Sequence, residues 1–291
     1  MFNGTGTALI TPFNEDLSID YKSLKLLIEH QIKNGVDAIV ILGTTGESPV
    51  IDDEERIKLV AESISIINGR VKTIIGTGTN DTKMVVKYNK IAEQFNADGV
   101  LIVNPYYNKS TQAGLVEHYK FISEHTVLPI ILYNVPSRTS MNMLPETILK
   151  IHDVCKNVVA VKEASGDISQ IAKLCAIKPD SLTVLSGNDD QTLPIMAMGG
   201  KGIISVLSNI YPKDVSELTN ATLKNDFAKA LEVHNKFLRM MNLLFVEANP
   251  IPVKFLASAK GLCKNILRLP LVKATSAMEK LLLEEDKKFG K

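Results

Sequence analysis

Short apolar segments and helix-like segments alternate eight times along the chain. Apolar runs rich in Val, Ile and Leu are typical of buried strands, whereas apolar residues three or four positions apart predict helices. The predicted strands are residues 6–10, 38–42, 73–75, 100–103, 130–133, 158–165, 182–185 and 203–207. The predicted helices include residues 21–33, 52–68, 81–95, 112–124, 168–175, 191–198 and one that begins at Pro145. Eight such units in roughly 225 residues predict a closed (β/α)8 barrel of the TIM type.

An open, doubly wound sheet is the alternative for the same alternation. Such sheets usually carry a G-x-G-x-x-G turn after the first strand. The nearest match in this chain is Gly76-Thr77-Gly78, but Asp81 stands where the third glycine would be. We therefore favour the closed barrel and interpret this stretch as an ordinary turn between a strand and a helix.

The chain becomes purely helical after the eighth unit. Residues 225–244, 252–260 and 272–288 have helical spacing, and prolines separate them. No linker rich in Gly and Ser marks a free domain. The sequence therefore predicts a barrel over residues 1–224 and additional C-terminal helices over residues 225–291 that pack on it.

Charge and composition restrict the possible partners. The chain has 33 Lys and Arg against 32 Asp and Glu, which leaves no excess charge for binding nucleic acid or an anionic membrane. No apolar run approaches the roughly 18 residues that span a bilayer, and no signal peptide is evident. The cysteines, Cys155, Cys175 and Cys263, form no C-x-x-C pair, and the histidines form no metal-binding motif. We expect reduced thiols in a cytoplasmic protein that has no metal site.

A lysine interrupts the sixth predicted strand. Because strands alternate their faces, Lys162 should lie on the same side as Val158 and Ala160, and Glu163 on the other. An ammonium among small apolar residues is costly unless it is paired, neutralised or used in chemistry. A lysine at the end of a buried strand can form a Schiff base with a carbonyl compound. The alternative is a structural lysine paired with a carboxylate such as that of Glu163.

Polar residues follow several predicted strands at the rim where barrel active sites lie. They are residues 43–47, 104–108, 133–139, 162–164 and 186–190. Tyr133 should point inward beside Lys162, because it shares a strand face with Ile131. The convergence of these segments on one rim favours a functional site.

Each of these segments also has a structural interpretation. Residues 43–46 could be only a tight turn, and Tyr106-Tyr107 could be a surface or interface pair. Ser137-Arg138 could be a charged, solvated loop. For Asp189-Asp190 we prefer acidic residues at the start of a helix over a metal site.

Several motifs resemble those of the dihydrodipicolinate synthase family, the pyruvate-dependent barrel lyases of lysine biosynthesis. The matching segments are residues 43–48 (GTTGES), 105–109 (PYYNK), 133–139 (YNVPSRT), 161–164 (VKEA), 199–205 (GGKGIIS) and 249–254 (NPIPVK). They follow one another in the family's order as far as about residue 270. The resemblance implies a cytoplasmic homotetramer, a dimer of dimers, that needs no metal or other cofactor.

The resemblance also implies a role for each catalytic residue. Lys162 would form a Schiff base with pyruvate, and the resulting enamine would attack the aldehyde of aspartate 4-semialdehyde. Tyr133 would move protons through Thr44 and through Tyr107, which would reach in from the neighbouring subunit. Such chemistry needs an acid and a base within hydrogen-bond reach.

Other residues would bind the two substrates. Backbone groups around Thr44 and Thr45 would hold the pyruvate carboxylate, and the Ile204 region would line the pocket, where Gly187 leaves room at the wall. The planar guanidinium of Arg138 would bind the carboxylate of the second substrate. Ser140 stands where many relatives have glycine, and we expect it to reshape this loop only slightly.

Two alternatives stay open. The enzyme could use another aldehyde, as N-acetylneuraminate lyase and 2-keto-3-deoxygluconate aldolase do, or the barrel could bind an oxo acid without catalysis. The Thr44-Thr45 pair and the loop 137–139 favour the synthase, because an arginine suits a short substrate that carries a carboxylate. The presence of Lys162 together with Tyr133 argues against a simple binder, which has no need of proton transfer.

We predict weak or absent inhibition by lysine. Relatives that lysine inhibits bind it at a subunit interface, and here Ser48, Asn80 and Tyr106 match their pattern. Asp53 and Arg56, however, replace histidines, and Met84 replaces a glutamate. The Met84 thioether cannot pair with the ammonium of lysine. Activity measured against increasing lysine tests the prediction, and strong inhibition below millimolar lysine would contradict it.

Overall fold

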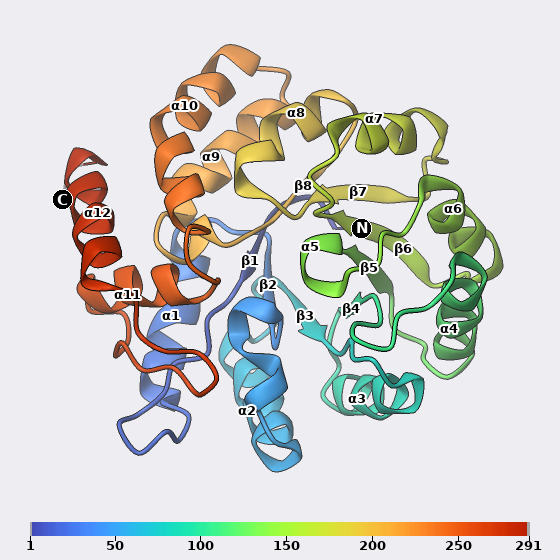
Figure 1. Ribbon diagram of the computed structural model, residues 1–291, viewed down its shortest axis with the longest axis horizontal. Coiled ribbons are helices and arrows are strands. Elements are labelled where there is room, and N and C mark those ends of the chain that lie inside the picture. The colour runs from blue at the N-terminus through green and yellow to red at the C-terminus, as the bar shows by residue number, and fades with distance from the viewer. Residues whose placement is uncertain (1, 290–291) are drawn as a thin grey trace.

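The computed structural model describes residues 2–289 and contains a closed barrel in which eight parallel strands pair in chain order. Figure 1 shows the strands at the centre with helices around them. The strands are β1 (Gly4–Ala8), β2 (Ala38–Ile41), β3 (Lys72–Gly76), β4 (Gly99–Val103), β5 (Ile130–Asn134), β6 (Val158–Glu163), β7 (Thr183–Ser186) and β8 (Gly202–Ser205). The predicted (β/α)8 barrel is thus confirmed.

Helices cover the outside of the barrel, and three more follow them. The barrel helices are α1 (Tyr21–Lys33), α2 (Asp53–Ile67), α3 (Thr82–Gln94), α4 (Gln112–Glu124), α6 (Pro145–Val154), α7 (Ile168–Ile177), α8 (Thr192–Ala197) and α9 (Pro212–Leu223). The additional C-terminal helices are α10 (Phe227–Leu243), α11 (Ile251–Ala259) and α12 (Ser276–Asp286). These three, orange to red in Figure 1, lie together on one side of the barrel. No helix in residues 2–289 is long and apolar enough to cross a membrane.

Capping residues explain where the predicted helices begin and end. The predictions for α1 and α4 are confirmed residue for residue. Asp52 and Asn68, the predicted ends of the second helix, are the caps of α2. Asp52 accepts a hydrogen bond from the Glu55 amide, and the backbone of Asn68 adopts a left-handed conformation. Asp81 and Phe95, the predicted ends of the third helix, are likewise the caps of α3. Side-chain acceptors of this kind satisfy the free amides of the first turn.

Two elements were poorly marked in the sequence. Strand β1 begins and ends two residues earlier than predicted. Thr5, which the prediction left out, is buried and shares a hydrogen bond between hydroxyls with Thr219 on α9. Helix α9 had no predicted bounds, since its buried face includes Ser216, Thr219 and Thr222 beside its few apolar residues. Small hydroxyl residues that find partners can replace apolar ones in a core.

The expected faces of the sixth strand are partly wrong. Ile130 pairs with Val158 and Ile131 with Ala160, so that Val159 is an extra residue in the pairing of β5 with β6. Val158 consequently packs in the outer apolar layer, not on the side of Ala160. A bulge of this kind shifts the alternation by one residue. Lys162 nevertheless points to the barrel interior, as predicted.

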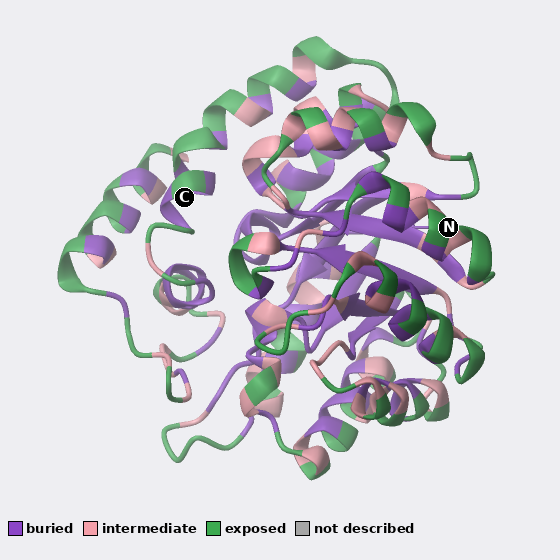
Figure 2. Cartoon of the chain, turned by 45° about the vertical axis from the view of Figure 1, so that its right-hand side comes forward, coloured by how far each residue is buried: buried purple, intermediate pink, exposed green. Residues whose placement is uncertain are grey.

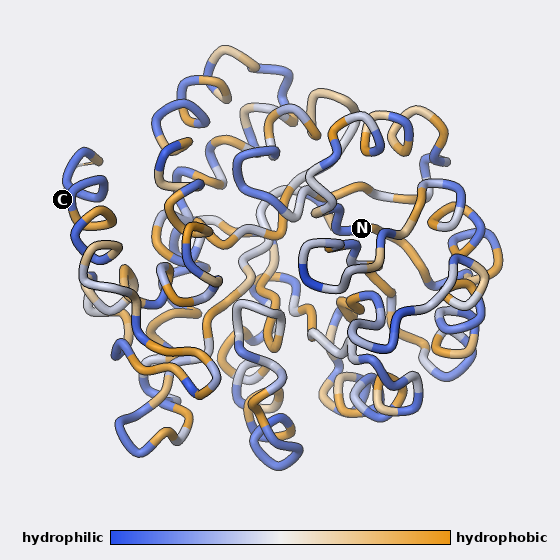
Figure 3. The backbone as a smooth tube through the Cα atoms, viewed as in Figure 1, coloured by the Kyte–Doolittle hydropathy of each residue, from blue (hydrophilic) through white to orange (hydrophobic). Residues whose placement is uncertain are grey.

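Two apolar layers hold the barrel together. The larger layer lies between strands and helices, and the smaller fills the barrel interior with residues such as Val40, Ile131 and Leu185. Figure 2 shows the strands as almost continuously buried, with exposed residues on the outer sides of the helices. Figure 3 shows the same distribution as hydrophobic strands and mixed helices. Together the two layers support a rigid rim of strand ends.

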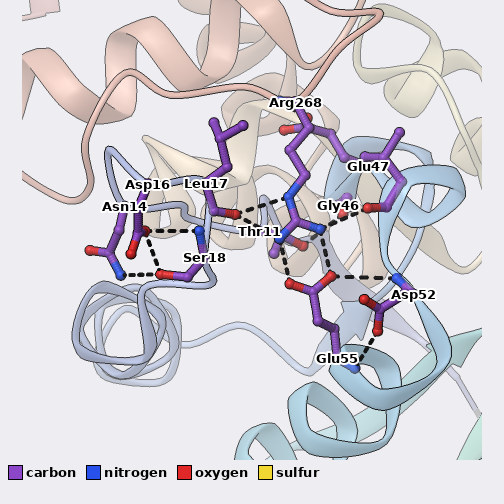
Figure 4. Close-up of polar contacts among 11 residues, drawn as sticks. Thr11, Asn14, Asp16, Leu17, Ser18, Gly46, Glu47, Asp52, Glu55 and Arg268 are labelled. Atoms are coloured by element: carbon purple, nitrogen blue, oxygen red, sulfur yellow. Dashed lines mark hydrogen bonds and ion pairs between the residues drawn. The ribbon is translucent and has the colours of Figure 1, made fainter.

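Buried charges join the C-terminal helices to the barrel. Lys254 on α11 forms an ion pair with Glu47, and the two side chains are 0% and 1% exposed. The backbone N–H of Arg268 donates to Glu47 Oε2 at 3.1 Å. The Arg268 guanidinium binds Glu55 on α2 and the carbonyl of Leu17 (Figure 4). The boundary that we place at residue 224 falls in the turn between α9 and α10.

We expect Lys254→Met to destabilise the protein by about 3–5 kcal/mol, because Glu47 would keep a buried charge without its partner. The double variant E47Q/K254M should recover most of this loss, since no charge is then buried alone. Unfolding in urea measures the difference.

Lys87→Met is the matched control, because Lys87 pairs with Asp53 at the surface, where the side chains are 52% and 46% exposed. An exposed pair contributes at most about 1 kcal/mol. Equal stability of K254M and K87M would contradict the prediction.

Candidate active site

A cavity of about 370 Å³ opens at the carboxyl rim of the barrel. Six of the eight predicted site residues line it: Thr44, Thr45, Tyr133, Arg138, Lys162 and Gly187. Ile204 lies in the apolar interior of the barrel, and Val206 forms the cavity wall after β8. Tyr107 lies outside this cavity, with its side chain 93% exposed and its φ at 70°. Its reach into a neighbouring subunit stays a prediction.

Lys162 and Tyr133 lie side by side inside the barrel. They are paired neighbours on β6 and β5, and Lys162 Nζ is 4.3 Å from the centre of the Tyr133 ring. Both side chains are buried. Lys162 forms no ion pair with any residue in the part of the chain that the structure describes. This arrangement does not support the alternative in which Lys162 pairs with Glu163.

Glu163 faces away from Lys162 into a network of amides. Its carboxyl group accepts hydrogen bonds from Asn134 Nδ2 and from the Ser165 amide, each at 3.0 Å. Asn134 in turn binds Asn104 and Asn142. Burial raises the pKa of Glu163 to about 7. Sequence reasoning missed this network, although Asn104 and Asn134 stand directly at the ends of their strands.

The turn after β2 holds Thr44 and Thr45 against the cavity. It forms a short 3₁₀ helix, η1 (Thr44–Gly46), which ends at Glu47 in a left-handed conformation with φ 56°. Thr11 Oγ1 donates to the Gly46 carbonyl at 2.7 Å, a contact that is drawn in Figure 4. The turn is therefore fixed by its own hydrogen bonds as well as by the Glu47 ion pair.

Gly187 lies in the cavity wall beside Lys162. A Cβ atom added to it would lie 2.6 Å from Ala164 Cβ and 3.0 Å from Lys162 Cε. These distances are shorter than van der Waals contact. Any other residue would therefore displace the Lys162 side chain or the strand that carries it.

Arg138 lies at the mouth of the cavity on a short helix, α5 (Pro136–Thr139), which the sequence did not predict. Its Nη2 donates to the Asn249 carbonyl at 3.3 Å. Ser140 ends this helix in a left-handed conformation with φ 53°. Glycine adopts that conformation without strain, whereas serine adopts it at a cost in free energy.

Asp189 stands at a helix start, as expected, and also has a second role. It begins the 3₁₀ helix η3 (Asp189–Gln191), but its buried carboxylate reaches to the loop after β8. There it accepts hydrogen bonds from Ser205 Oγ at 2.5 Å and from the amide of Val206 at 3.0 Å. Asp189 thus joins the loops that follow β7 and β8. No group of three or more His, Cys, Asp or Glu residues within the described range could hold a metal ion.

Four cavity residues come from outside the eight barrel units. They are Phe245, Glu247, Ala248 and Asn249, which follow α10. Sequence reasoning gave them no role, although Asn249 begins the last of the quoted motifs. The motif at residues 249–254 was the sequence feature that could have indicated their place in the cavity.

A second cavity of about 370 Å³ shares Thr44, Tyr133 and Arg138 with the first. The guanidinium of Arg56 lines it, stacks on the Tyr88 ring at 4.0 Å and donates to the Ser48 carbonyl at 3.1 Å. Asp53 instead pairs with Lys87 at the surface, and Met84 is half-buried on α3. A fixed positive charge in this cavity opposes binding of another cation. Weak inhibition by lysine stays a prediction.

Comparisons with known proteins agree over nearly the whole chain. The sequence profile described as the dihydrodipicolinate synthetase family matches residues 1–285. A 4-hydroxy-tetrahydrodipicolinate synthase of Fervidobacterium nodosum is 48% identical over 290 residues, which cover 100% of this chain and 99% of the relative. One of Thermotoga neapolitana is 48% identical over 285 residues, 97% of each chain.

Solved structures give the same result. The crystal structure of dihydrodipicolinate synthase from Thermotoga maritima superposes with a TM-score of 0.98 at 46% identity, covering 100% of this chain and 99% of that one. The enzyme from Aquifex aeolicus gives a TM-score of 0.97 at 43% identity, with 99% and 98% covered. The similarity therefore includes the barrel, the rim and the C-terminal helices.

We expect Glu163→Gln to flatten the pH dependence of stability. Burial raises the pKa of Glu163 from 4.5 to about 7 in the folded protein. The stabilisation from the protonated carboxyl is fully present below pH 4.5 and is lost as the pH rises through about 7. Between pH 4.5 and 7 the free energy of unfolding of the unsubstituted protein should fall by about 3 kcal/mol relative to that of E163Q. Denaturant unfolding at a series of pH values measures this.

Glu146→Gln is the control, because the hydrogen bond from Lys173 lowers the pKa of exposed Glu146 below this pH window. Its curve should run parallel to that of the unsubstituted protein. A parallel curve for E163Q as well would contradict the prediction.

Proposed function

Because this chain belongs to the dihydrodipicolinate synthetase family, we propose that it is a lyase that catalyses the reaction of its relatives, the 4-hydroxy-tetrahydrodipicolinate synthases. It would join pyruvate to L-aspartate 4-semialdehyde in the diaminopimelate route to lysine. The single observation that carries the proposal is the position of Lys162, buried in the rim cavity with its Nζ over the Tyr133 ring at 4.3 Å.

The chemistry begins at Lys162. Its amine adds to the keto carbon of pyruvate, and loss of water leaves a Schiff base. Loss of a proton from the pyruvate methyl group gives an enamine, whose carbon forms the new bond with the aldehyde carbon of the second substrate. The aldehyde oxygen then takes up a proton. The amino group of the second substrate finally attacks the imine carbon, which closes the ring, breaks the bond to Lys162 and frees its amine. The covalent bond to Lys162 makes a further cofactor unnecessary.

Tyr133 is the group best placed to move these protons. Its ring lies against the Lys162 amine, and its side chain lines the same cavity. Thr44 lines both cavities and can continue a chain of hydroxyls from Tyr133. By resemblance to the family, Tyr107 from a neighbouring subunit completes the chain in a homotetramer, a dimer of dimers located in the cytoplasm.

The remaining residues would bind the two carboxylates. Thr45 and the backbone beside it would bind that of pyruvate, Gly187 leaves space beside Lys162, and Ile204 supports the wall from inside the barrel. The Arg138 guanidinium at the mouth would bind the carboxylate of the aldehyde. A guanidinium can form two parallel hydrogen bonds to a carboxylate, which fixes orientation as well as affinity. Its presence favours aspartate semialdehyde over an uncharged sugar aldehyde.

Trapping of the Schiff base tests the proposal. We expect reduction with borohydride in the presence of pyruvate to attach the substrate to Lys162, as seen by mass spectrometry of the protein and its peptides. Lys162→Arg should acquire no adduct, because a guanidinium does not form the Schiff base. Lys173→Arg, a surface control whose ammonium pairs with Glu146, should behave like the unsubstituted protein.

Two results would count against the proposal. An adduct on K162R would exclude Lys162 as the nucleophile, and no adduct on the unsubstituted protein would indicate a binder. If the adduct forms, turnover of sugar-derived aldehydes in place of aspartate semialdehyde would identify another class I aldolase.

A further inference from the structure

The segment 245–249 completes the candidate active site from outside the barrel units. It connects α10 to α11 and contributes four residues to the cavity lining. Glu247 in this segment accepts a hydrogen bond from Thr275 Oγ1 at 2.6 Å, which holds the segment from the C-terminal side. The additional helices are therefore part of the site, not only a cover for the barrel.

Asn249 contacts both residues that we propose as carboxylate binders. Its Nδ2 donates to Thr45 Oγ1 at 2.9 Å, and its backbone carbonyl accepts from Arg138 Nη2 at 3.3 Å. The residue is 6% exposed. Its Oδ1 is buried and has no hydrogen-bond partner among residues 2–289. The side-chain amide thus forms one hydrogen bond among these residues, the one to Thr45.

This bond fixes the direction in which the Thr45 hydroxyl can donate. A hydroxyl has one proton and two acceptor positions, whereas an amide nitrogen can only donate. Asn249 Nδ2 therefore occupies one acceptor position of Thr45 Oγ1. The hydroxyl proton stays available for an acceptor elsewhere, and Thr45 lines the cavity in which the substrate carboxylate would lie.

A second contact holds the same two segments together. The Lys254–Glu47 ion pair joins α11 to the end of the turn that carries Thr45. Asn249 precedes α11 by two residues. The hydrogen bond from the Asn249 side chain and the ion pair therefore hold the turn at two points. Together they keep the Asn249 amide at a constant position relative to the Thr45 hydroxyl.

We propose that Asn249 is a positioning residue that supports each of the two carboxylate-binding sites through a separate contact. Through its side-chain amide it directs the Thr45 hydroxyl proton toward the carboxylate of the oxo acid. Through its backbone carbonyl it holds the Arg138 guanidinium for the carboxylate of the aldehyde. The inference rests on the proposed function, since it assigns a role in binding those two substrates.

The test is a double-mutant cycle with Asn249→Leu and Thr45→Val. N249L keeps nearly the volume of asparagine, removes the amide donor and leaves the backbone carbonyl that binds Arg138. We expect the KM for pyruvate to rise about tenfold to a hundredfold, as for a lost hydrogen bond to a charged group. The KM for aspartate semialdehyde should change less than about threefold, because the contact of Arg138 is with the backbone.

The second half of the cycle separates this role from simple packing. If Asn249 acts through the Thr45 hydroxyl, adding N249L to T45V should change the KM for pyruvate less than about twofold. Equal effects of N249L in both backgrounds, or equal changes in the KM of both substrates, would overturn the proposal. Asn220→Leu, an exposed control on α9, should leave both KM values unchanged.

Asn249→Asp is a second variant of the same shape, in case N249L does not fold. Its carboxylate can only accept a hydrogen bond, so the Thr45 hydroxyl would donate to it and not to the substrate. The KM for pyruvate should therefore again rise more in the protein that keeps Thr45 than in T45V. The same KM change in both backgrounds would overturn the proposal.

The reduced pyruvate adduct of the unsubstituted protein is measured alongside. Its absence would reject the proposed function and this inference together. Its presence, with unchanged pyruvate KM in both Asn249 variants, would reject this inference alone.

Discussion

The buried ion pair between Glu47 and Lys254 is the interaction on which the site depends. Two charges without solvent contact are tolerated only because each neutralises the other and because the carboxylate also accepts from the Arg268 amide. The pair joins the turn after β2 to α11, so the turn that carries Thr44 and Thr45 cannot move independently of the C-terminal helices. The rim cavity exists in its observed form because these two parts of the chain are held together.

The two buried lysines show how the surroundings decide the role of a side chain. Lys254 has a carboxylate partner and is structural, since its charge is used to connect two elements. Lys162 lies against a phenol ring at the end of a strand, in a cavity and without an ion pair among the described residues. The sequence alone left both interpretations open for Lys162, because spacing along a strand does not reveal which groups surround an amine.

Most of the fold and much of the candidate site could be predicted from the sequence. Helices with an acidic cap and apolar residues at helical spacing, such as α1 and α3, were placed to within their capping residues. The polar strand ends were also predicted, since parallel strands bring their carboxyl ends to one rim. Strand β1 and helix α9 were not delimited well, because buried threonines and serines take the place of apolar residues there. The contribution of Asn249 was missed, since the contact with Thr45 joins residues 204 positions apart.

The extra residue at Val159 has a consequence for how such a chain can vary. The side chains on the two sides of this bulge do not follow one continuous alternation of faces. The residues before Ala160 therefore do not determine which way Lys162 points. An insertion or deletion near the start of this strand can be taken up by forming or removing a bulge. The orientation of the amine is set instead by its pairing with Tyr133 and by the space at Gly187. The beginning of this strand can therefore vary while the end that carries Lys162 stays in register.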